Sequence, residues 1–119
     1  MLHAQDVHVV VRGEVDRRQR YHAQERVAHA ARHVHDPVLF ARVTLTAAPE
    51  PARGRPVIAR ALLDVGGRTV AAATSAAGMY EAIDRVHERL RDQLEHLNSR
   101  RESRRRRGTG HRLAGRGVA

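Results

Sequence analysis

A stripe of apolar side chains near the end of the chain most constrains how this sequence can fold. Its members recur at steps of four, three, four, four and three residues: Met79, Ile83, Val86, Leu90, Leu94 and Leu97. Residues at this spacing lie on one face of an α-helix. The stripe therefore predicts an amphipathic helix over residues 78 to about 100, whose apolar face must pack against a second layer.

Alternating apolar and polar residues predict four strands, at residues 7–11, 38–47, 57–65 and 68–75. In the second strand the alternation assigns Leu39 to the inward-facing set. Gly66 and Gly67 separate the last two strands, which is a strong signal for a two-residue hairpin. Residues 48–56 hold three of the four prolines and are expected to form a loop.

A second helix is predicted between the first two strands. Apolar residues at helical spacing indicate its buried face: Ala23, Val27, Ala30 and Val34. Asp16 is the expected N-cap, and the helix is expected to extend over residues 17–35 and to end before Pro37. The order β-α-β-β-β-α predicts a two-layer α+β fold, with a four-stranded sheet and both helices on one face. The other sheet face is left to solvent or to a partner.

Charge is distributed unevenly along the 119 residues. Residues 1–97 hold 14 Arg and 12 acidic side chains, whereas residues 98–119 hold eight Arg and one Glu, and the chain has no Lys. We expect one domain over residues 1–100 and a disordered Arg-rich tail over residues 101–119. Such a basic excess is typical of proteins that bind polyanions, nucleic acid first and anionic membrane second.

Several classes of protein are excluded or disfavoured by the sequence. The chain has no Cys, which excludes a disulfide scaffold, a thiolate metal site and a Cys nucleophile. It shows no bilayer-spanning apolar run and no secretory signal, so we expect a cytoplasmic protein that does not use a membrane. It has no phosphate-binding loop and no nucleophile elbow, so we expect no enzyme, no cofactor and no small-molecule substrate.

Histidines are frequent, with nine in the chain. His29 and His33 lie four residues apart on one predicted helix, a spacing that can bind zinc. No His-Glu-x-x-His motif accompanies them, and we expect no metal. We expect instead that histidines beside Arg protonate on acidification and strengthen the binding of phosphate.

Arginines at helical spacing indicate an RNA-binding surface. The second helix places Arg85, Arg89 and Arg100 on one stripe away from its apolar face, and the first helix adds Arg18 and Arg32. The planar guanidinium suits phosphate because it binds in a two-pronged geometry. If the helices lie side by side, the two stripes are expected to form one basic surface. The competing interpretation is an ordinary solvated helix face.

The second helix also resembles a known family. Its residues Met79-Tyr80-Glu81-Ala82-Ile83-Asp84, then Arg89-Leu90 and Gln93-Leu94, are similar to the last helix of the ribosome hibernation promoting factors. These are also called ribosome-associated inhibitor A or sigma-54 modulation proteins, and their pattern is Met-Tyr-x-Ala-Ile-Asp followed by Lys-Leu-x-x-Gln-Leu. The lead-in and second strand after Asp36 resemble the same family. The resemblance covers about residues 7–97.

The resemblance implies a fold like that of double-stranded-RNA-binding domains and a non-catalytic function. The partner would be the small ribosomal subunit, bound through 16S rRNA in the groove between head and body. Occupying the sites of mRNA and tRNA would silence translation under stress or in stationary phase. With the basic positions of the family included, the candidate RNA-binding residues are Arg18, Arg26, Arg32, Arg85, Arg89, Arg100, Arg101 and Arg104.

The sequence departs from the family in the second helix, where Asp92 and Glu95 replace usual basic residues. Two alternatives therefore stay open. One is a non-catalytic protein-interaction or dimerisation module that uses the free sheet face, with Arg42, Thr44 and Arg60. The other is a general double-stranded RNA binder. The oligomeric state of the protein and the pairing of ribosomes are left open by the sequence.

Overall fold

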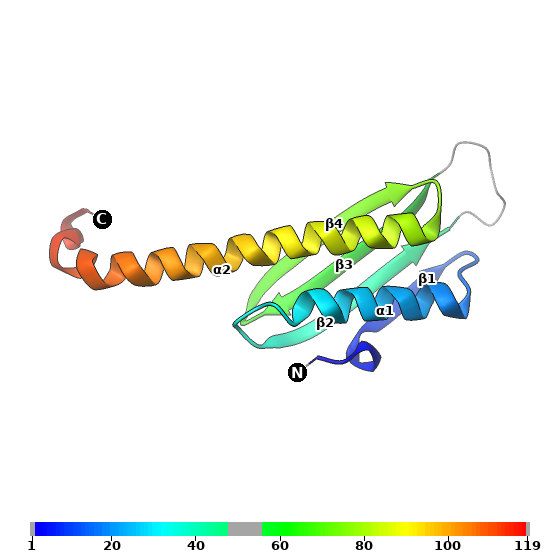
Figure 1. Cartoon of the computed structure of the whole chain (residues 1–119), viewed down its shortest axis with the longest axis horizontal. Coiled ribbons are helices and arrows are strands. Elements are labelled where there is room, and N and C mark those ends of the chain that lie inside the picture. The colour runs from blue at the N-terminus through cyan, green and yellow to red at the C-terminus, as the bar shows by residue number, and fades with distance from the viewer. Residues whose placement is uncertain (1, 48–55, 119) are drawn as a thin grey trace.

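The structure is a computed structural model of the chain and describes residues 2–47 and 56–118, with side chains described as far as Ser99 (Figure 1). A short 3-10 helix, η1 (Ala4–Asp6), precedes the first strand. The helices are α1 (Arg17–Ala31) and α2 (Met79–Val118). The strands are β1 (His8–Arg12), β2 (Val38–Thr46), β3 (Val57–Val65) and β4 (Arg68–Ala76).

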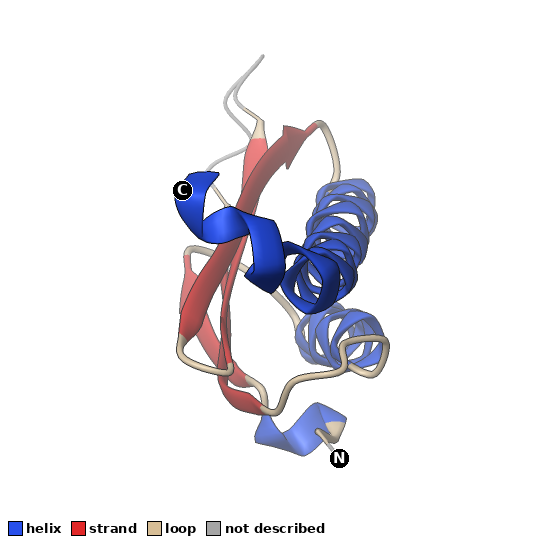
Figure 2. Ribbon diagram, turned by 90° about the vertical axis from the view of Figure 1, so that its left-hand side faces the viewer, coloured by secondary structure: helices blue, strands red, loops and turns tan. Residues whose placement is uncertain are grey.

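The four strands form one sheet in the order β1-β2-β3-β4. Strand β1 runs parallel to β2, which requires the crossover through α1, and the other pairs are antiparallel. Both helices cover the same face of the sheet, and the opposite face is left open (Figure 2). The predicted α+β two-layer fold is therefore confirmed.

The core lies between the sheet and the helices and is made mostly of Ala, Val and Leu. The predicted stripe of α2 is buried from Met79 to Leu94, and Leu97 packs partly buried against the core. On α1, Ala23, Val27 and Ala30 are fully buried as predicted. The largest buried side chains of the sheet are Leu45, Leu63, Val43 and Val65. Apolar burial thus fixes which side of each helix faces the sheet.

Helix α1 ends earlier than the sequence predicts. It stops at Ala31, with Arg32 as C-cap, and not at residue 35. After Ala31 the backbone N–H groups of His33 and Val34 bond only three residues back, to the carbonyls of Ala30 and Ala31, and the amide of Asn98 on α2 donates to the carbonyl oxygen of His33 at 2.9 Å. At its other end the expected N-cap is confirmed, because Asp16 accepts from the backbone N–H of Gln19 at 2.8 Å.

A register shift in β2 corrects one assignment. The pairing of β2 with β3 slips between Val38 and Phe40, and the intervening Leu39 is 63% exposed instead of facing inward. The alternation resumes at Ala41, which is buried. A local bulge of this kind adds one residue to a strand and turns a side chain away from its expected face.

Two tight backbone features hold the sheet together. Gly66 and Gly67 have φ values of +59° and +91° and form the predicted hairpin, in which Asp64 accepts from the N–H of Gly67 at 2.9 Å. Gly13 has a φ of +90°, and a Cβ built there would lie 1.8 Å from the carbonyl oxygen of Ala47. The end of β1 can therefore approach the end of β2 only with glycine at this position.

Helix α2 continues to Val118 and projects past the sheet (Figure 1). Residues 101–118 are helical in the structure, and the disordered Arg-rich tail expected over residues 101–119 stays a prediction. Arg is a good helix former, and residues 79–107 contain neither Gly nor Pro. A separate domain boundary near residue 100 stays a prediction. Most of the loop predicted at residues 48–56 lies outside the described residues. In the part of the chain that is described, no helix is long and apolar enough to cross a membrane.

Candidate nucleic-acid interface

The two helices meet along a polar seam that contains one of the predicted RNA-binding residues. Asp84 of α2 lies 2.8 Å from Nε2 of His22 and 3.4 Å from Nε of Arg26, both on α1. The Arg26 side chain is 35% exposed. Its charge is therefore largely committed to joining the helices, and it is a poor candidate for a phosphate contact.

A buried histidine continues this seam. A terminal nitrogen of Arg26 donates to Nδ1 of His87 at 3.1 Å, and Nε2 of His87 lies 3.3 Å from Nδ1 of His29. Because Arg can only donate, Nδ1 of His87 accepts and its proton sits on Nε2, directed at His29. Burial, with Arg26, His29 and Arg91 close by, lowers the pKa of His87 to about 4. Burial and neighbouring cations also lower the pKa of His29.

These lowered pKa values run against the expectation that His29 gains charge on mild acidification and strengthens phosphate binding. A proton on His87 would instead face the guanidinium of Arg26. Among the described residues, no group of three His, Cys, Asp or Glu side chains is placed to hold a metal ion. His87 thus contributes to the packing of the helices in its neutral form.

The seam predicts that acid destabilises the protein. The pKa of His87 is about 4 in the folded state, against about 6.5 in the unfolded chain, so the unfolded state binds more protons between these values. The contribution of neutral His87 to the stability of the protein is therefore fully present above pH 6.5 and is lost as the pH falls towards 4. We expect the free energy of unfolding to drop by about 2 kcal/mol between pH 7 and pH 5. Urea denaturation at the two pH values measures this difference.

A His87→Gln variant serves as the control for this prediction, because glutamine keeps a polar side chain but cannot titrate. Its free energy of unfolding should be lower at pH 7 but should change less between pH 7 and pH 5. An equal pH dependence in the variant and the unaltered protein would contradict the assignment to His87.

Two predicted residues lie exposed on α1. Arg18 lies in the first turn of α1 and Arg32 is its C-cap, and both side chains are exposed. Glu25 lies midway between them, seven residues from each. Within the described residues, no hydrogen bond or ion pair involves either guanidinium. They are free to contact a ligand, but Glu25 separates them and lowers the local positive charge.

Arg85 and Arg89 lie on the flank of α2 that faces away from α1, over the β4 edge of the sheet. Arg85 donates to the carbonyl oxygen of Ser75 at 3.0 Å and Arg89 to that of Ala73 at 3.1 Å. Gln93 continues the series and donates to Ala71 at 2.8 Å. We call these three side chains the edge cover, because they occupy carbonyl groups of β4 that no neighbouring strand pairs.

The two basic stripes therefore do not merge, and the prediction of one surface across both helices is wrong. The helices do lie side by side, but α2 turns Asp84 and His87 towards α1 and turns Arg85 and Arg89 away from it. Between the two flanks, the exposed ridge of α2 is acidic. This ridge consists of Glu81, Glu88, Asp92 and Glu95.

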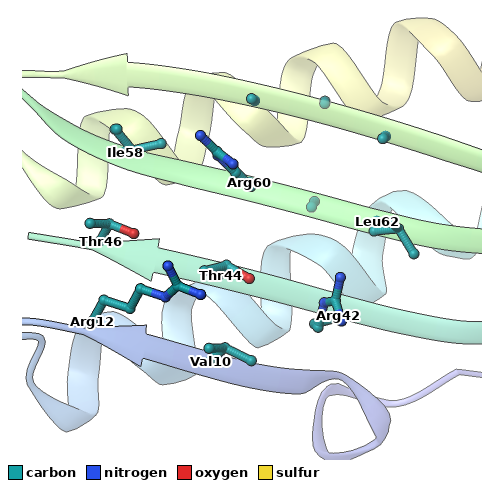
Figure 3. Close-up of a pocket in the computed structure, with 12 residues that line it drawn as sticks. Val10, Arg12, Arg42, Thr44, Thr46, Ile58, Arg60 and Leu62 are labelled. Atoms are coloured by element: carbon teal, nitrogen blue, oxygen red, sulfur yellow. The ribbon is translucent and has the colours of Figure 1, made fainter.

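Arginines also gather on the open face of the sheet. Arg12, Arg42 and Arg60 rise from three neighbouring strands around a hollow of about 870 Å³, beside Thr44 and Thr46 (Figure 3). In the described part of the chain no side chain forms a hydrogen bond or ion pair with these guanidiniums. Asp64, at the hairpin end, is the one acidic residue on the outward positions of the described strands.

The arginines of the open face are continued by others around the β4 edge of the sheet. A second hollow of about 400 Å³ lies at β4 and is lined by Arg60, Arg85 and Arg89. Ile58 and Ala73 line both hollows, so the two are adjacent. We call the combined surface the arginine track. It consists of Arg12, Arg42, Arg60, Arg85 and Arg89.

The structure thus brings two of the eight predicted residues, Arg85 and Arg89, together with three that were not among them. Arg42 and Arg60 were expected on the open face, but for a protein partner. Arg12 was missed, although the alternation of β1 points it outward beside Val10. Arg100, Arg101 and Arg104 lie where side chains are not described.

These features define a small two-layer α+β domain with an arginine-lined open face, a charge pattern that is typical of polyanion-binding domains. The chain belongs to the family described as sigma 54 modulation protein / S30EA ribosomal protein, whose sequence model matches residues 7–102. The resemblance inferred from α2 is thereby confirmed. Comparison with curated protein sequences gives no match.

Solved structures share the fold. The N-terminal domain of Protein Y from Thermus thermophilus is 26% identical, with a TM-score of 0.62 over 75% of this chain and 93% of that one. A ribosomal subunit interface protein from Coxiella burnetii is 17% identical, with a TM-score of 0.56 over 77% of this chain and 98% of that one. The second likeness is to the fold alone.

Proposed function

We propose that this protein binds the small ribosomal subunit through 16S rRNA and keeps it from translating by occupying the channel for mRNA and tRNA. The observation that carries the proposal is the family match over residues 7–102, which spans the whole two-layer domain. The likeness to Protein Y supports it. The protein would act in the cytoplasm, where ribosomes lie, and without catalysis.

The arginine track is the surface that we assign to rRNA phosphates. Arg12, Arg42 and Arg60 have their guanidiniums free within the described structure, and Arg89 spends only one nitrogen on a β4 carbonyl. A guanidinium offers five N–H donors, so Arg89 retains donors for a phosphate. Arg18 and Arg32 on α1 provide a second, smaller contact. The Arg-rich end, with Arg100, Arg101 and Arg104, would add further phosphate contacts.

The proposal is tested by co-sedimentation of the full chain with purified small subunits at about 50 and 200 mM salt. We expect saturable binding near one copy per subunit at the lower salt. Because phosphate contacts release counterions, the affinity should fall by about 10³-fold or more at the higher salt if six or more phosphates are bound. Added mRNA and tRNA should displace the protein.

Charge reversal localises the contact. Arg60→Glu should weaken subunit binding about tenfold or more, since it replaces a phosphate donor by a repelling charge. Arg17→Glu makes the same charge change in the first turn of α1, where an acidic residue suits the helix dipole, and should have little effect. A folded protein that fails to bind subunits at either salt would contradict the proposed function.

A further inference from the structure

We propose that the open face of the sheet is a binding site for single-stranded RNA. The arginine track holds the phosphates, and a base stacks at the other end of the face, on the rings of His8 and Phe40. This deepens the proposed function and rests on it for the choice of RNA as the partner. It adds the kind of RNA, unpaired and not duplex, and the surface that holds it.

The arrangement of the arginines suits an extended polyanion. In the strand register, Arg60 pairs with Thr44 on β2, and Thr44 lies two residues from Arg42. Standard strand spacings place the Cα atoms of Arg42 and Arg60 about 8 Å apart and those of Arg60 and Arg12 about 12 Å apart. Three free guanidiniums at these separations can each take a different phosphate of one strand. At the β4 edge Arg89 continues the path, whereas the guanidinium of Arg85 is ion-paired with Glu81 at 2.7 Å.

Room for the strand comes from the small side chains of β4. Ala73 is the register partner of Arg60, and Ala71 is the partner of Leu62. These alanines line the larger hollow, and their short side chains leave space beside the Arg60 guanidinium. A flexible chain can therefore approach the sheet closely, and a base can lie against a guanidinium plane or against Leu62.

An exposed ring pair at the other end of the face indicates unpaired bases. The rings of His8 and Phe40 stack with their centroids 5.4 Å apart and an interplanar angle of 23°. Phe40 is 37% exposed, and His8 is the register partner of Arg42. Aromatic faces can accept a base only when it is unstacked from its own helix, and four-stranded sheets are a common platform for this. Duplex RNA would not use these rings.

A second copy of this chain is a poorer occupant of the same face. Symmetric pairing of two open faces would bring the guanidiniums of Arg12, Arg42 and Arg60 against the same three of the other copy. Among the described strand residues, Asp64 is the one acidic residue on each open face. The acidic ridge of α2 lies on the opposite layer of the domain. Charge complementarity therefore favours a polyanion over a copy of the protein.

The test is fluorescence anisotropy with the full chain and a labelled ten-nucleotide single-stranded RNA of mixed sequence. Arg42→Glu combined with Arg60→Glu should weaken binding at least tenfold. Arg17→Glu combined with Arg20→Glu makes an equal charge change on α1 and should weaken it less than threefold. Arg42→Gln with Arg60→Gln guards against a folding defect, and should lower the slope of log affinity against log salt by about 1.4.

The ring pair gives an independent readout. Phe40→Leu should weaken binding about tenfold and leave the salt slope unchanged, because stacking involves no counterion release. Equal competition by duplex RNA of the same length would overturn the proposal, as would equal losses in the α1 variant. Self-association that is abolished by the Arg42 and Arg60 substitutions, without RNA binding, would assign the face to a protein partner instead.

The two proposals fail in different ways. If the protein binds the RNA oligonucleotide through Arg42 and Arg60 but does not bind small subunits, the proposed function is overturned and the site stands. If it binds subunits but Arg42→Glu with Arg60→Glu changes neither subunit nor oligonucleotide binding, the single-strand site is overturned and the proposed function stands.

Discussion

Replacing Leu90 with Ala should lower the free energy of unfolding by about 3–4 kcal/mol. Leu90 is completely buried at the centre of the α2 stripe. The loss combines the transfer of the deleted atoms with the cavity that remains. Many neighbouring core residues are alanines, whose short side chains cannot move into the space. The melting temperature should fall by about 15 °C, which thermal unfolding followed by circular dichroism would measure.

Leu39→Ala is the matched control, since Leu39 is 63% exposed at the β2 bulge. Its effect should stay within about 0.5 kcal/mol. A loss below about 1 kcal/mol for Leu90→Ala would contradict the position of α2 over the sheet. That position also determines where Arg85 and Arg89 lie, so the measurement bears on the site as well as on the core.

Gly13→Ala is expected to destabilise the protein by about 3 kcal/mol. The added Cβ would lie 1.8 Å from the carbonyl oxygen of Ala47, and the backbone has a φ of +90°, which L-residues rarely adopt. The ends of β1 and β2 must separate to make room, which strains the hydrogen bond from the N–H of Ala47 to the carbonyl of Arg12. Denaturant unfolding measures the loss.

Gly67→Ala separates the two causes. Gly67 has nearly the same φ, +91°, but a Cβ there meets no atom within 4 Å. Only the cost of the positive φ remains, about 1 kcal/mol. The difference between the two variants is thus the cost of the close approach at Gly13. Equal effects would show that β1 does not lie against Ala47 as described.

The fold followed from local patterns. Alternation placed β3 at the residues observed, and the glycine pair fixed the hairpin. The apolar stripe of α2 identified its buried face, because the apolar residues that recur at helical spacing are the ones that the helix buries. Gln19 has a local role: its side chain accepts from the backbone N–H of Asp16 at 3.1 Å.

The site could be predicted only in part, because helical spacing gives the angle of a stripe but not its neighbour. Arg26 and Arg85 both looked like surface cations in the sequence. One is held in the seam by Asp84 and the other lies over the β4 edge. Which flank of α2 faces α1 depends on the packing of the whole domain. That Arg60 lies beside Arg85 and Arg89 depends on how β3 and β4 pack beside α2.

Charge reversal at Arg85 and Arg89 would have a mixed effect. Each residue donates to a β4 carbonyl, so a carboxylate at either position would face an acceptor without a donor. Loss of RNA binding in such a double variant would combine altered charge with a disturbed sheet edge. Arg60, whose guanidinium makes no such bond in the described structure, gives the cleaner measurement.

The edge cover also limits how molecules of this protein can join. An incoming strand from another chain extends a sheet by bonding to unpaired carbonyls and N–H groups along its border. Along β4 three carbonyls are already occupied by Arg85, Arg89 and Gln93. A foreign strand would have to displace all three donors, which disfavours edge-to-edge growth of sheets into fibrils at this border while the basic surface beside it stays accessible.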